Sequence, residues 1–154
     1  MADAPHIMIV ESRYYEEIAE ELITSVLSEL KSFGATYERF EVPGAFEIPA
    51  AIKFAIESSE LGSSQQNFDG FIALGCVIRG QTSHYDYVCG ESARGLQDLA
   101  LKYSLALGYG ILTVENQEQA LARARRSEQD RGGHAARACL RMLELKSHFK
   151  LFSQ

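Results

Sequence analysis

The residues best placed to do chemistry lie in the short segment IRGQTSH, residues 78–84. An apolar run precedes this segment and a helical pattern follows it, so the chain should leave a strand through Gly80 and enter a helix. Backbone N–H groups at a helix N-terminus, together with the helix dipole, attract anions. The segment therefore predicts a phosphate site. It is not a P-loop, because the spacing GxxxxGK[ST] is absent.

His84 falls just inside the predicted helix, beside this anion site. Histidine is the side chain that ordinarily exchanges protons near neutral pH, which favours a catalytic role; an exposed or helix-capping histidine is the alternative. His134 and His148 are expected on the surface of the last helix. A metal site is not expected, because His84-Tyr85-Asp86 offers no tetrahedral ligand set.

Cys76, Cys89 and Cys139 are odd in number and form no CxxC pair. This pattern favours a reducing cytoplasm over a disulfide framework. Cys76 should be an inert thiol in a buried strand. Cys89 follows His84 by five residues, about 140° around a helix, so it cannot pair with His84 as a nucleophile. Covalent catalysis is therefore not expected.

The elements that must position these residues alternate between strands and helices, which is typical of βαβ units. Apolar runs predict strands at residues 6–10, 35–42, 71–78 and 110–114. Helical periodicity predicts helices at about 14–33, from Pro49 onward, 83–104, 116–125 and 133–149. We expect one domain over residues 1–154: an α/β fold with a flavodoxin-like three-layer α/β/α sandwich around a four-stranded parallel sheet. Ligands bind beyond the carboxyl ends of such strands, where residues 11–15, 42–48, 77–84 and 114–116 should converge.

The helix ends carry their own signals in the sequence. Gly34 should close the first helix in a left-handed conformation. Asn116 with Gln119 three residues later resembles a capping box at the start of the short helix. One face of the last helix should be buried, formed by Ala135, Cys139, Met142 and Leu143.

Composition excludes several classes of protein. The chain has 154 residues, of which 46% are hydrophobic and 23% charged, as is ordinary for a soluble globular domain. A net charge of −6 makes nucleic acid an unexpected partner. No apolar run approaches the roughly 20 residues needed to cross a membrane. The residues after Met1 lack the basic and apolar regions of a secretory signal, so a cytoplasmic location is expected.

Three segments carry a resemblance to a known family. VPGAFEIPAA (42–51), GCVIRGQTSHYDYVCGES (75–92) and GILTVENQEQALARA (110–124) resemble, in order and spacing, the signature segments of the lumazine synthase family. The resemblance covers essentially the whole chain. It implies a transferase of riboflavin biosynthesis that condenses 5-amino-6-(D-ribitylamino)uracil with 3,4-dihydroxy-2-butanone 4-phosphate. It implies neither a cofactor nor a metal.

The same resemblance assigns a group of residues to the ribitylaminouracil. Tyr14 would stack on the pyrimidine ring, although a residue packed on the core at the helix start is the alternative. Ala45, Phe46 and Glu47 match the segment that holds the ribityl chain. Glu47 would accept hydrogen bonds from ribityl hydroxyls, with a carboxylate in a first helical turn as the alternative.

Further residues match the phosphate and pyrimidine contacts of the family. Val77 and Ile78 would contact the pyrimidine edge through backbone groups. Gln81 and Thr82 would hold the phosphate by main-chain N–H groups, with the Thr82 hydroxyl adding a contact. His84 aligns with the histidine that shuttles protons in the family.

The remaining matches concern a neighbouring subunit. Arg123 aligns with an arginine that reaches the phosphate from the neighbour, and a solvated surface charge is its alternative. Tyr109 aligns with an aromatic residue, usually Phe, that closes the neighbour's pocket. Arg131 replaces the family's lysine near the phosphate. Tyr15 stands where the family often has Asn, which leaves that ribityl contact open.

The resemblance implies a homo-oligomer with active sites shared between subunits, and a closed ring of five is the expected form. Some family members build icosahedral shells, whose threefold contacts lie near the loop between the last two helices. Here residues 125–131 carry five charged side chains, with no glycine before Gly132, which favours a free pentamer over the shell. Small-molecule substrates are the expected ligands, and the resemblance allows an association with riboflavin synthase.

Two alternatives stay open. An archaeal-type riboflavin synthase has a similar fold but uses two lumazine molecules and needs no phosphate site, so Gln81, Thr82 and Arg123 argue against it. A non-catalytic flavin- or lumazine-binding shell protein could keep the same pocket, although His84 favours the enzyme. A response-regulator receiver is excluded, because no aspartate stands at the end of a central strand to be phosphorylated.

Overall fold

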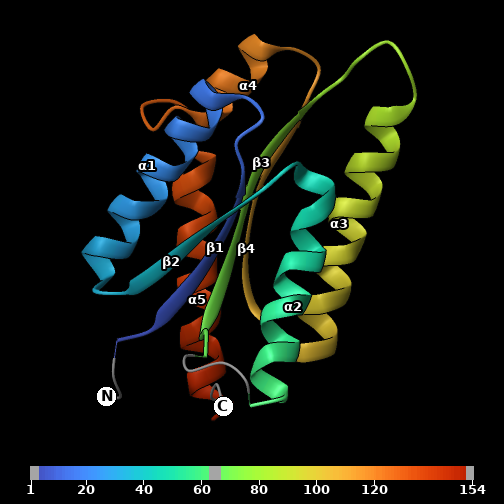
Figure 1. Cartoon of the computed structure of the whole chain (residues 1–154). Helices are drawn as coiled ribbons and strands as arrows, with labels where there is room; N and C mark the ends of the chain where they lie inside the picture. The colour runs from blue at the N-terminus through green and yellow to red at the C-terminus, as the bar shows by residue number, and fades with distance from the viewer. Residues whose placement is uncertain (1–3, 63–66, 152–154) are drawn as a thin grey trace.

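The computed structural model describes residues 4–62 and 67–151, where strands and helices alternate in the predicted order (Figure 1). The strands are β1 (His6–Ser12), β2 (Thr36–Val42), β3 (Gly70–Ile78) and β4 (Ala106–Val114). The helices are α1 (Glu16–Phe33), α2 (Ile48–Glu60), α3 (His84–Tyr103), α4 (Gln117–Ala124) and α5 (Arg131–His148), with a 3-10 turn, η1 (Ala45–Glu47), before α2. The ends of the domain predicted over 1–154, residues 1–3 and 152–154, lie outside the described range.

The four described strands form one parallel sheet in the order β2-β1-β3-β4. Its register pairs Ser12 with Val42 and Ile78 with Val114, so neighbouring strands finish at the same edge. That edge is uppermost in Figure 1. Parallel neighbours need crossover connections, and helices supply them here. The predicted flavodoxin-like fold is confirmed.

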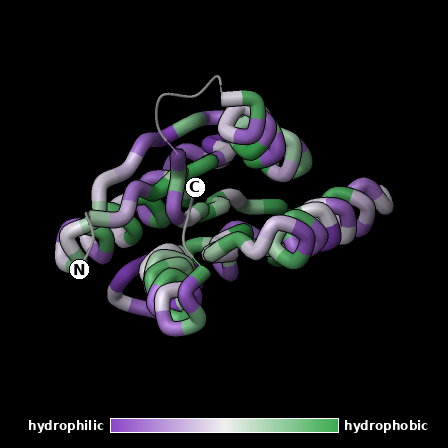
Figure 2. Tube along the Cα trace, turned by 90° about the horizontal axis from the view of Figure 1, so that it is seen from below, coloured by the Kyte–Doolittle hydropathy of each residue, from purple (hydrophilic) through white to green (hydrophobic). Residues whose placement is uncertain are grey.

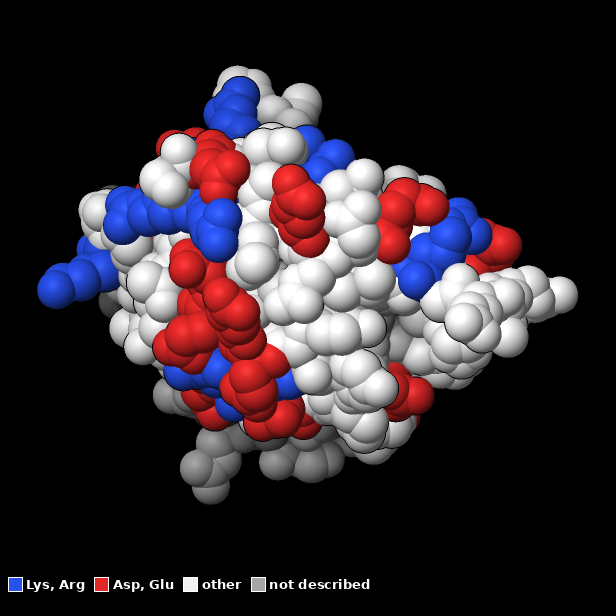
Figure 3. Space-filling model, turned by 90° about the horizontal axis from the view of Figure 1, so that it is seen from above, with Lys and Arg blue, Asp and Glu red and all other residues white. Residues whose placement is uncertain are grey.

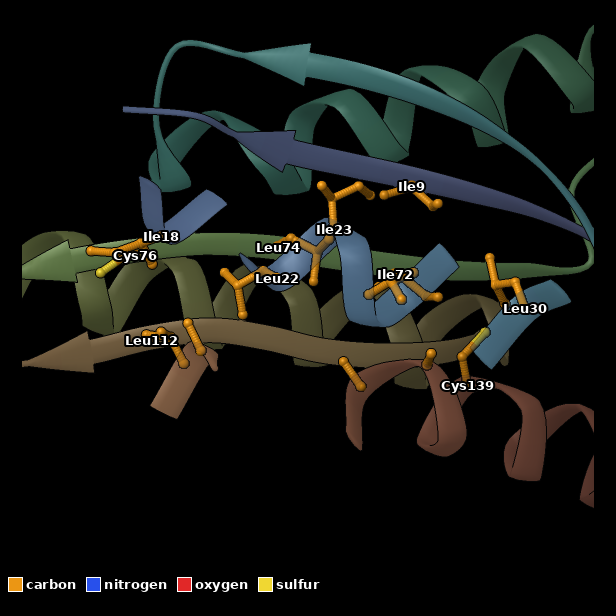
Figure 4. Close-up of a cluster of buried hydrophobic side chains, with 14 of the residues drawn as sticks. Ile9, Ile18, Leu22, Ile23, Leu30, Ile72, Leu74, Cys76, Leu112 and Cys139 are labelled. Atoms are coloured by element: carbon orange, nitrogen blue, oxygen red, sulfur yellow. The ribbon is translucent and has the colours of Figure 1, made fainter. Parts of the chain in front are cut away.

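Alternation along the strands divides the core between the two faces of the sheet. One set of side chains packs with α1, α4 and α5 (Figure 4), and it includes Ile7, Ile9, Ile72 and Leu74. The other set packs with α2 and α3, and it includes Met8, Val10, Phe71 and Ala73. Figure 2, viewed from the opposite end of the strands, shows helices on both sides of the sheet. These are the three predicted layers.

The predicted helix ends are largely as expected. Gly34 takes a left-handed conformation with φ of 89°, and its N–H donates to the carbonyl of Leu30. The Asn116 side chain accepts from the backbone N–H of Gln119 at 2.9 Å. The Gln119 side chain accepts in return from the backbone N–H of Glu115 at 2.8 Å, one residue earlier than a capping box requires.

Two details differ from the prediction. β4 begins at Ala106 rather than residue 110, because α3 ends in the left-handed Ser104 and the chain enters the sheet directly afterwards. Met142 is exposed rather than buried, since it faces a groove beside α3, whereas Ala135 and Cys139 are buried as predicted. His134 and His148 are exposed, as expected. Among the described helices, none is both long and apolar enough to cross a membrane.

Candidate active site

A cleft of about 700 Å³ opens at the carboxyl edge of the sheet. Its walls come from the β1–α1 turn, the segment between β2 and α2, the end of β3 and the start of α3. Figure 3 looks onto this end of the molecule and shows acidic side chains gathered on one side, next to a broad uncharged surface. The cleft therefore lies where the fold predicts a ligand site. Seven predicted site residues line it: Tyr14, Ala45, Phe46, Glu47, Val77, Ile78 and His84.

Two tyrosines form one wall of the cleft. Tyr14 is 75% exposed and so does not pack on the core. Tyr15 is half-buried and meets the Tyr14 ring edge-on, with ring centroids 4.9 Å apart. Burial raises the pKa of the Tyr15 phenol, with smaller contributions from Cys76 and Tyr14. Tyr15 thus keeps its proton at neutral pH. Its edge-on contact supports the Tyr14 ring, whose open face can stack on a flat aromatic ligand.

An ion-pair network that sequence reasoning missed holds the turn carrying these tyrosines. Glu11 is only 3% exposed and accepts from Arg13 at 2.9 Å and from Arg39 at 2.8 Å. Arg13 also donates to Glu20 at 2.6 Å and to Glu16 at 3.1 Å, and these contacts raise the pKa of its guanidinium. A buried carboxylate is costly without such partners, so the pairing fixes the turn. An acid at a strand end followed by arginine was the available sequence signal.

The segment between β2 and α2 supplies a carboxylate. Ala45 is buried, while Phe46 and Glu47 are exposed at the cleft. Glu47 is the one carboxylate among the described residues that line the cleft. A Cβ at Gly44 would lie 3.3 Å from the Glu47 carboxylate, so the glycine leaves room for this side chain. A carboxylate in this place can accept hydrogen bonds from ligand hydroxyl groups.

The opposite wall is the end of β3 and the start of α3. Val77 and Ile78 are half-buried in the last strand positions. His84 is the first residue of α3, and its backbone N–H donates to the Thr82 hydroxyl at 3.3 Å. The imidazole is exposed and lines the cleft, so it can exchange protons with a bound ligand.

Five predicted site residues lie outside the cleft: Gln81, Thr82, Tyr109, Arg123 and Arg131. Gln81 and Thr82 are exposed in the loop between Ile78 and His84, just beyond the cleft wall. The fourth segment expected here, residues 114–116, does not line the cleft either. It adjoins the third segment instead, because the Arg79 N–H donates to the Val114 carbonyl at 2.9 Å.

The other three residues lie on different surfaces of the same chain. Tyr109 lines a separate apolar groove of about 530 Å³ beside α3. Arg123 is half-buried on α4, and its guanidinium donates to the Gln119 carbonyl at 3.1 Å. Arg123 forms no ion pair with another described residue. Arg131 is the exposed first residue of α5. Within one chain these residues and His84 do not meet at the cleft.

The cleft has one thiol in its lining, that of Cys76. Burial raises the pKa of this thiol to about 12, so it stays protonated at neutral pH. A protonated thiol is a poor nucleophile. Within residues 4–62 and 67–151 no group of three or more His, Cys, Asp or Glu side chains could hold a metal ion.

The chain matches one known protein family over nearly its whole length. The model of the family described as 6,7-dimethyl-8-ribityllumazine synthase matches residues 4–147. This chain belongs to that family. The lumazine synthase match spans every residue that lines the cleft, together with Tyr109, Arg123 and Arg131.

Individual lumazine synthases are similar over nearly their full length. The 6,7-dimethyl-8-ribityllumazine synthase 1 of Rhizobium meliloti strain 1021 is 57% identical over 141 residues, 92% of this chain and 91% of the relative. The Agrobacterium fabrum protein is 54% identical over 142 residues, 92% of this chain and 95% of the relative. The Paramagnetospirillum magneticum protein is 44% identical over 147 residues, 96% of this chain and 98% of the relative.

Proposed function

We propose that this chain catalyses the condensation of 5-amino-6-(D-ribitylamino)uracil with 3,4-dihydroxy-2-butanone 4-phosphate to 6,7-dimethyl-8-ribityllumazine, the penultimate step of riboflavin biosynthesis. Phosphate and water leave. The observation that carries this proposal is the cleft itself, which combines an open tyrosine ring, one carboxylate and one imidazole in a lumazine synthase chain. These groups match a flat ring, a polyhydroxyl chain and a reaction that needs proton transfer.

The ribitylaminouracil would bind in the cleft of a single chain. Its pyrimidine ring stacks on Tyr14 and meets backbone groups of Val77 and Ile78 at its edge. Its ribityl chain runs along η1, where Glu47 accepts hydrogen bonds from the hydroxyls. Ala45 and Phe46 shape the wall of this part of the cleft. Support comes from the exposure of Tyr14 and Glu47, which leaves both free to contact a ligand.

The phosphate would bind at the rim next to this ring. Gln81 and Thr82 offer main-chain N–H groups before α3, and the dipole of α3 favours an anion there. His84, one turn away, moves protons during phosphate elimination and ring closure. Arg123 and Arg131 add positive charge, with Arg123 reaching the phosphate from a neighbouring subunit.

A shared site requires an assembly. Arg123 has no carboxylate partner among the described residues, and Tyr109 lines an open apolar groove, as expected of residues that serve a neighbour. The proposed form is a homopentamer of five 17.1 kDa chains, about 85 kDa in all.

Arg125 and Glu128 pair at 3.1 Å in the loop before α5. This charged loop disfavours close threefold packing into a shell. A cytoplasmic location and an association with riboflavin synthase remain parts of the proposal.

The test is a reaction of purified protein with both substrates, followed by the fluorescence of the lumazine product. Lumazine formation faster than in buffer supports the proposal. Conversion of added lumazine to riboflavin would instead identify an enzyme of the riboflavin synthase type. Tight binding of lumazine with no rate above buffer would identify a binding protein. Either of these outcomes overturns the proposal.

A further inference from the structure

Arg79 stands in the proposed phosphate loop, yet its guanidinium is engaged elsewhere. Its Nε lies 3.0 Å from both carboxylate oxygens of Glu115. The guanidinium carbon lies 4.3 Å from the centroid of the Tyr85 ring, and Nη1 lies 3.6 Å from Asp86. The hydrogen bond that Arg79 donates to Glu115 is the main cause of the raised pKa of Arg79. A planar guanidinium can make an edge contact with a carboxylate and a face contact with a ring at once, which an ammonium cannot.

These contacts turn Arg79 away from the cleft. Neither Arg79 nor any of its three partners, Tyr85, Asp86 and Glu115, lines the cleft, although His84 next to Tyr85 does. An arginine within a phosphate loop would ordinarily suggest a direct phosphate ligand. In this chain the guanidinium instead joins the first turn of α3 to the residue that follows β4.

Glu115 is in turn built into the start of α4. Its backbone N–H donates to the Gln119 side chain at 2.8 Å, and the Gln119 N–H donates to the Asn116 side chain at 2.9 Å. Gln119 also presents the carbonyl that holds the Arg123 guanidinium at 3.1 Å. One continuous set of polar contacts therefore runs from the first turn of α3, through Arg79 and Glu115, to Arg123.

We propose that Arg79 is a positioning residue. Through its contact with Glu115, it holds the phosphate loop and His84 in a fixed position relative to Arg123. The loop and His84 belong to one site, whereas Arg123 serves the adjacent site. The inference rests on the proposed function, because it assumes that the loop and Arg123 both hold phosphate. Loss of either partner displaces both phosphate-binding elements. Phosphate binding weakens as a result, while Tyr14 and Glu47, which contact the ribitylaminouracil from other segments of the cleft, keep their places.

The test compares Arg79→Gln, Glu115→Gln and the double variant in steady-state kinetics. Each single change should raise KM for the butanone phosphate about 5- to 30-fold and leave KM for ribitylaminouracil within about twofold. The double variant should be no worse than the poorer single variant, because both changes break the same link. Arg79→Lys should recover only part of the loss, since lysine keeps the charge but not the plane.

Two results separate this role from others. If Arg79 were a phosphate ligand, Glu115→Gln would free its guanidinium and leave KM for the butanone phosphate unchanged or lower, which overturns the proposal. Additive effects in the double variant overturn it as well. Glu29→Gln is the matched control, because Glu29 pairs with Arg137 at 3.1 Å between α1 and α5, away from the cleft. Glu29→Gln should leave both KM values unchanged. If the unaltered protein made no lumazine, the proposed function would fail first, and the two failures are thus distinguishable.

Discussion

The backbone N–H of His84 donates to the hydroxyl oxygen of Thr82 at 3.3 Å, across the turn that opens α3. The residue proposed to carry protons and the residue proposed to hold phosphate are therefore fixed to each other. Elimination of phosphate needs proton transfer close to the leaving group. The short turn places these two residues side by side.

His84→Ala should lower kcat by about 10- to 1000-fold and leave KM for ribitylaminouracil nearly unchanged, because a general acid–base group acts on the reaction rather than on ring binding. Some rate should remain, since the substrates can condense without the enzyme. His134→Ala on the exposed face of α5 is the control and should match the unaltered protein. An unchanged kcat in His84→Ala would remove His84 from the mechanism.

Mixing two variants of low activity tests the shared site. Arg123→Ala and His84→Ala chains, denatured and refolded together, should regain activity, because some sites then combine an intact His84 with an intact Arg123 from the neighbour. Separately refolded chains, mixed afterwards, are the control and should keep the low rate of the parents. If co-assembled chains, shown by mass to be mixed, stay as inactive as the parents, Arg123 acts within its own chain.

The thiols provide a test against covalent catalysis. Burial raises the pKa values of Cys76 and Cys139 to about 12, so at pH 8 both thiols stay protonated. Both thiols should therefore stay unmodified when the folded protein is treated with iodoacetamide at pH 8, and react once urea unfolds it. Peptide mass spectrometry reads out each site. Rapid labelling of Cys76 in the folded protein would show an activated thiol in the cleft.

The raised pKa values of these two thiols also make the free energy of unfolding depend on pH. Their folded pKa lies above the ordinary value of 9.0, so the protonated form is the one that the fold favours. Their contribution to stability is complete below that ordinary value and is lost as pH rises from there toward about 12. Between pH 6 and 8 they should not alter the free energy of unfolding, as measured by urea denaturation.

Close packing of α5 on β4 gives a prediction for stability. A Cβ at Gly108 would overlap the carbonyl oxygen of Ala135, which is backbone and cannot move aside. Gly108→Ala should therefore lower the free energy of unfolding by about 1–3 kcal/mol, measured by urea denaturation. Gly90→Ala in α3 is the control, because its Cβ would meet nothing within 4 Å. It should be neutral or stabilising by about 0.5–1 kcal/mol. Equal effects of the two changes would contradict the packing.

Local sequence signals predicted most of the fold because they act over a few residues. The apolar runs of β1 and β3 and the glycine after α1 are each readable from neighbours alone. β4 was predicted four positions short, at 110 instead of Ala106. Only the left-handed Ser104 and Leu105 separate β4 from α3, and no glycine or proline marks the boundary. The prediction that Met142 is buried is wrong, because helical spacing identifies the apolar face of α5 but not which residues at its edge border an open groove.

The site was less predictable than the fold. The residues that line the cleft share a strand edge, which topology alone brings together. The pairing of Glu11 with Arg39, 28 residues apart, and that of Arg79 with Glu115, 36 residues apart, depend on tertiary packing. No local pattern reports such pairs. They became visible only once strand order and register were known.

The most direct measurement of the central claim follows lumazine and inorganic phosphate in the same reaction. The protein, supplied with both substrates, should form the two products in equal amounts, faster than buffer alone and only when both substrates are present. His84→Ala should lower the rates of lumazine formation and phosphate release by the same factor. Phosphate release without lumazine, or lumazine formation no faster than in buffer, would contradict the assignment of this cleft to lumazine synthesis.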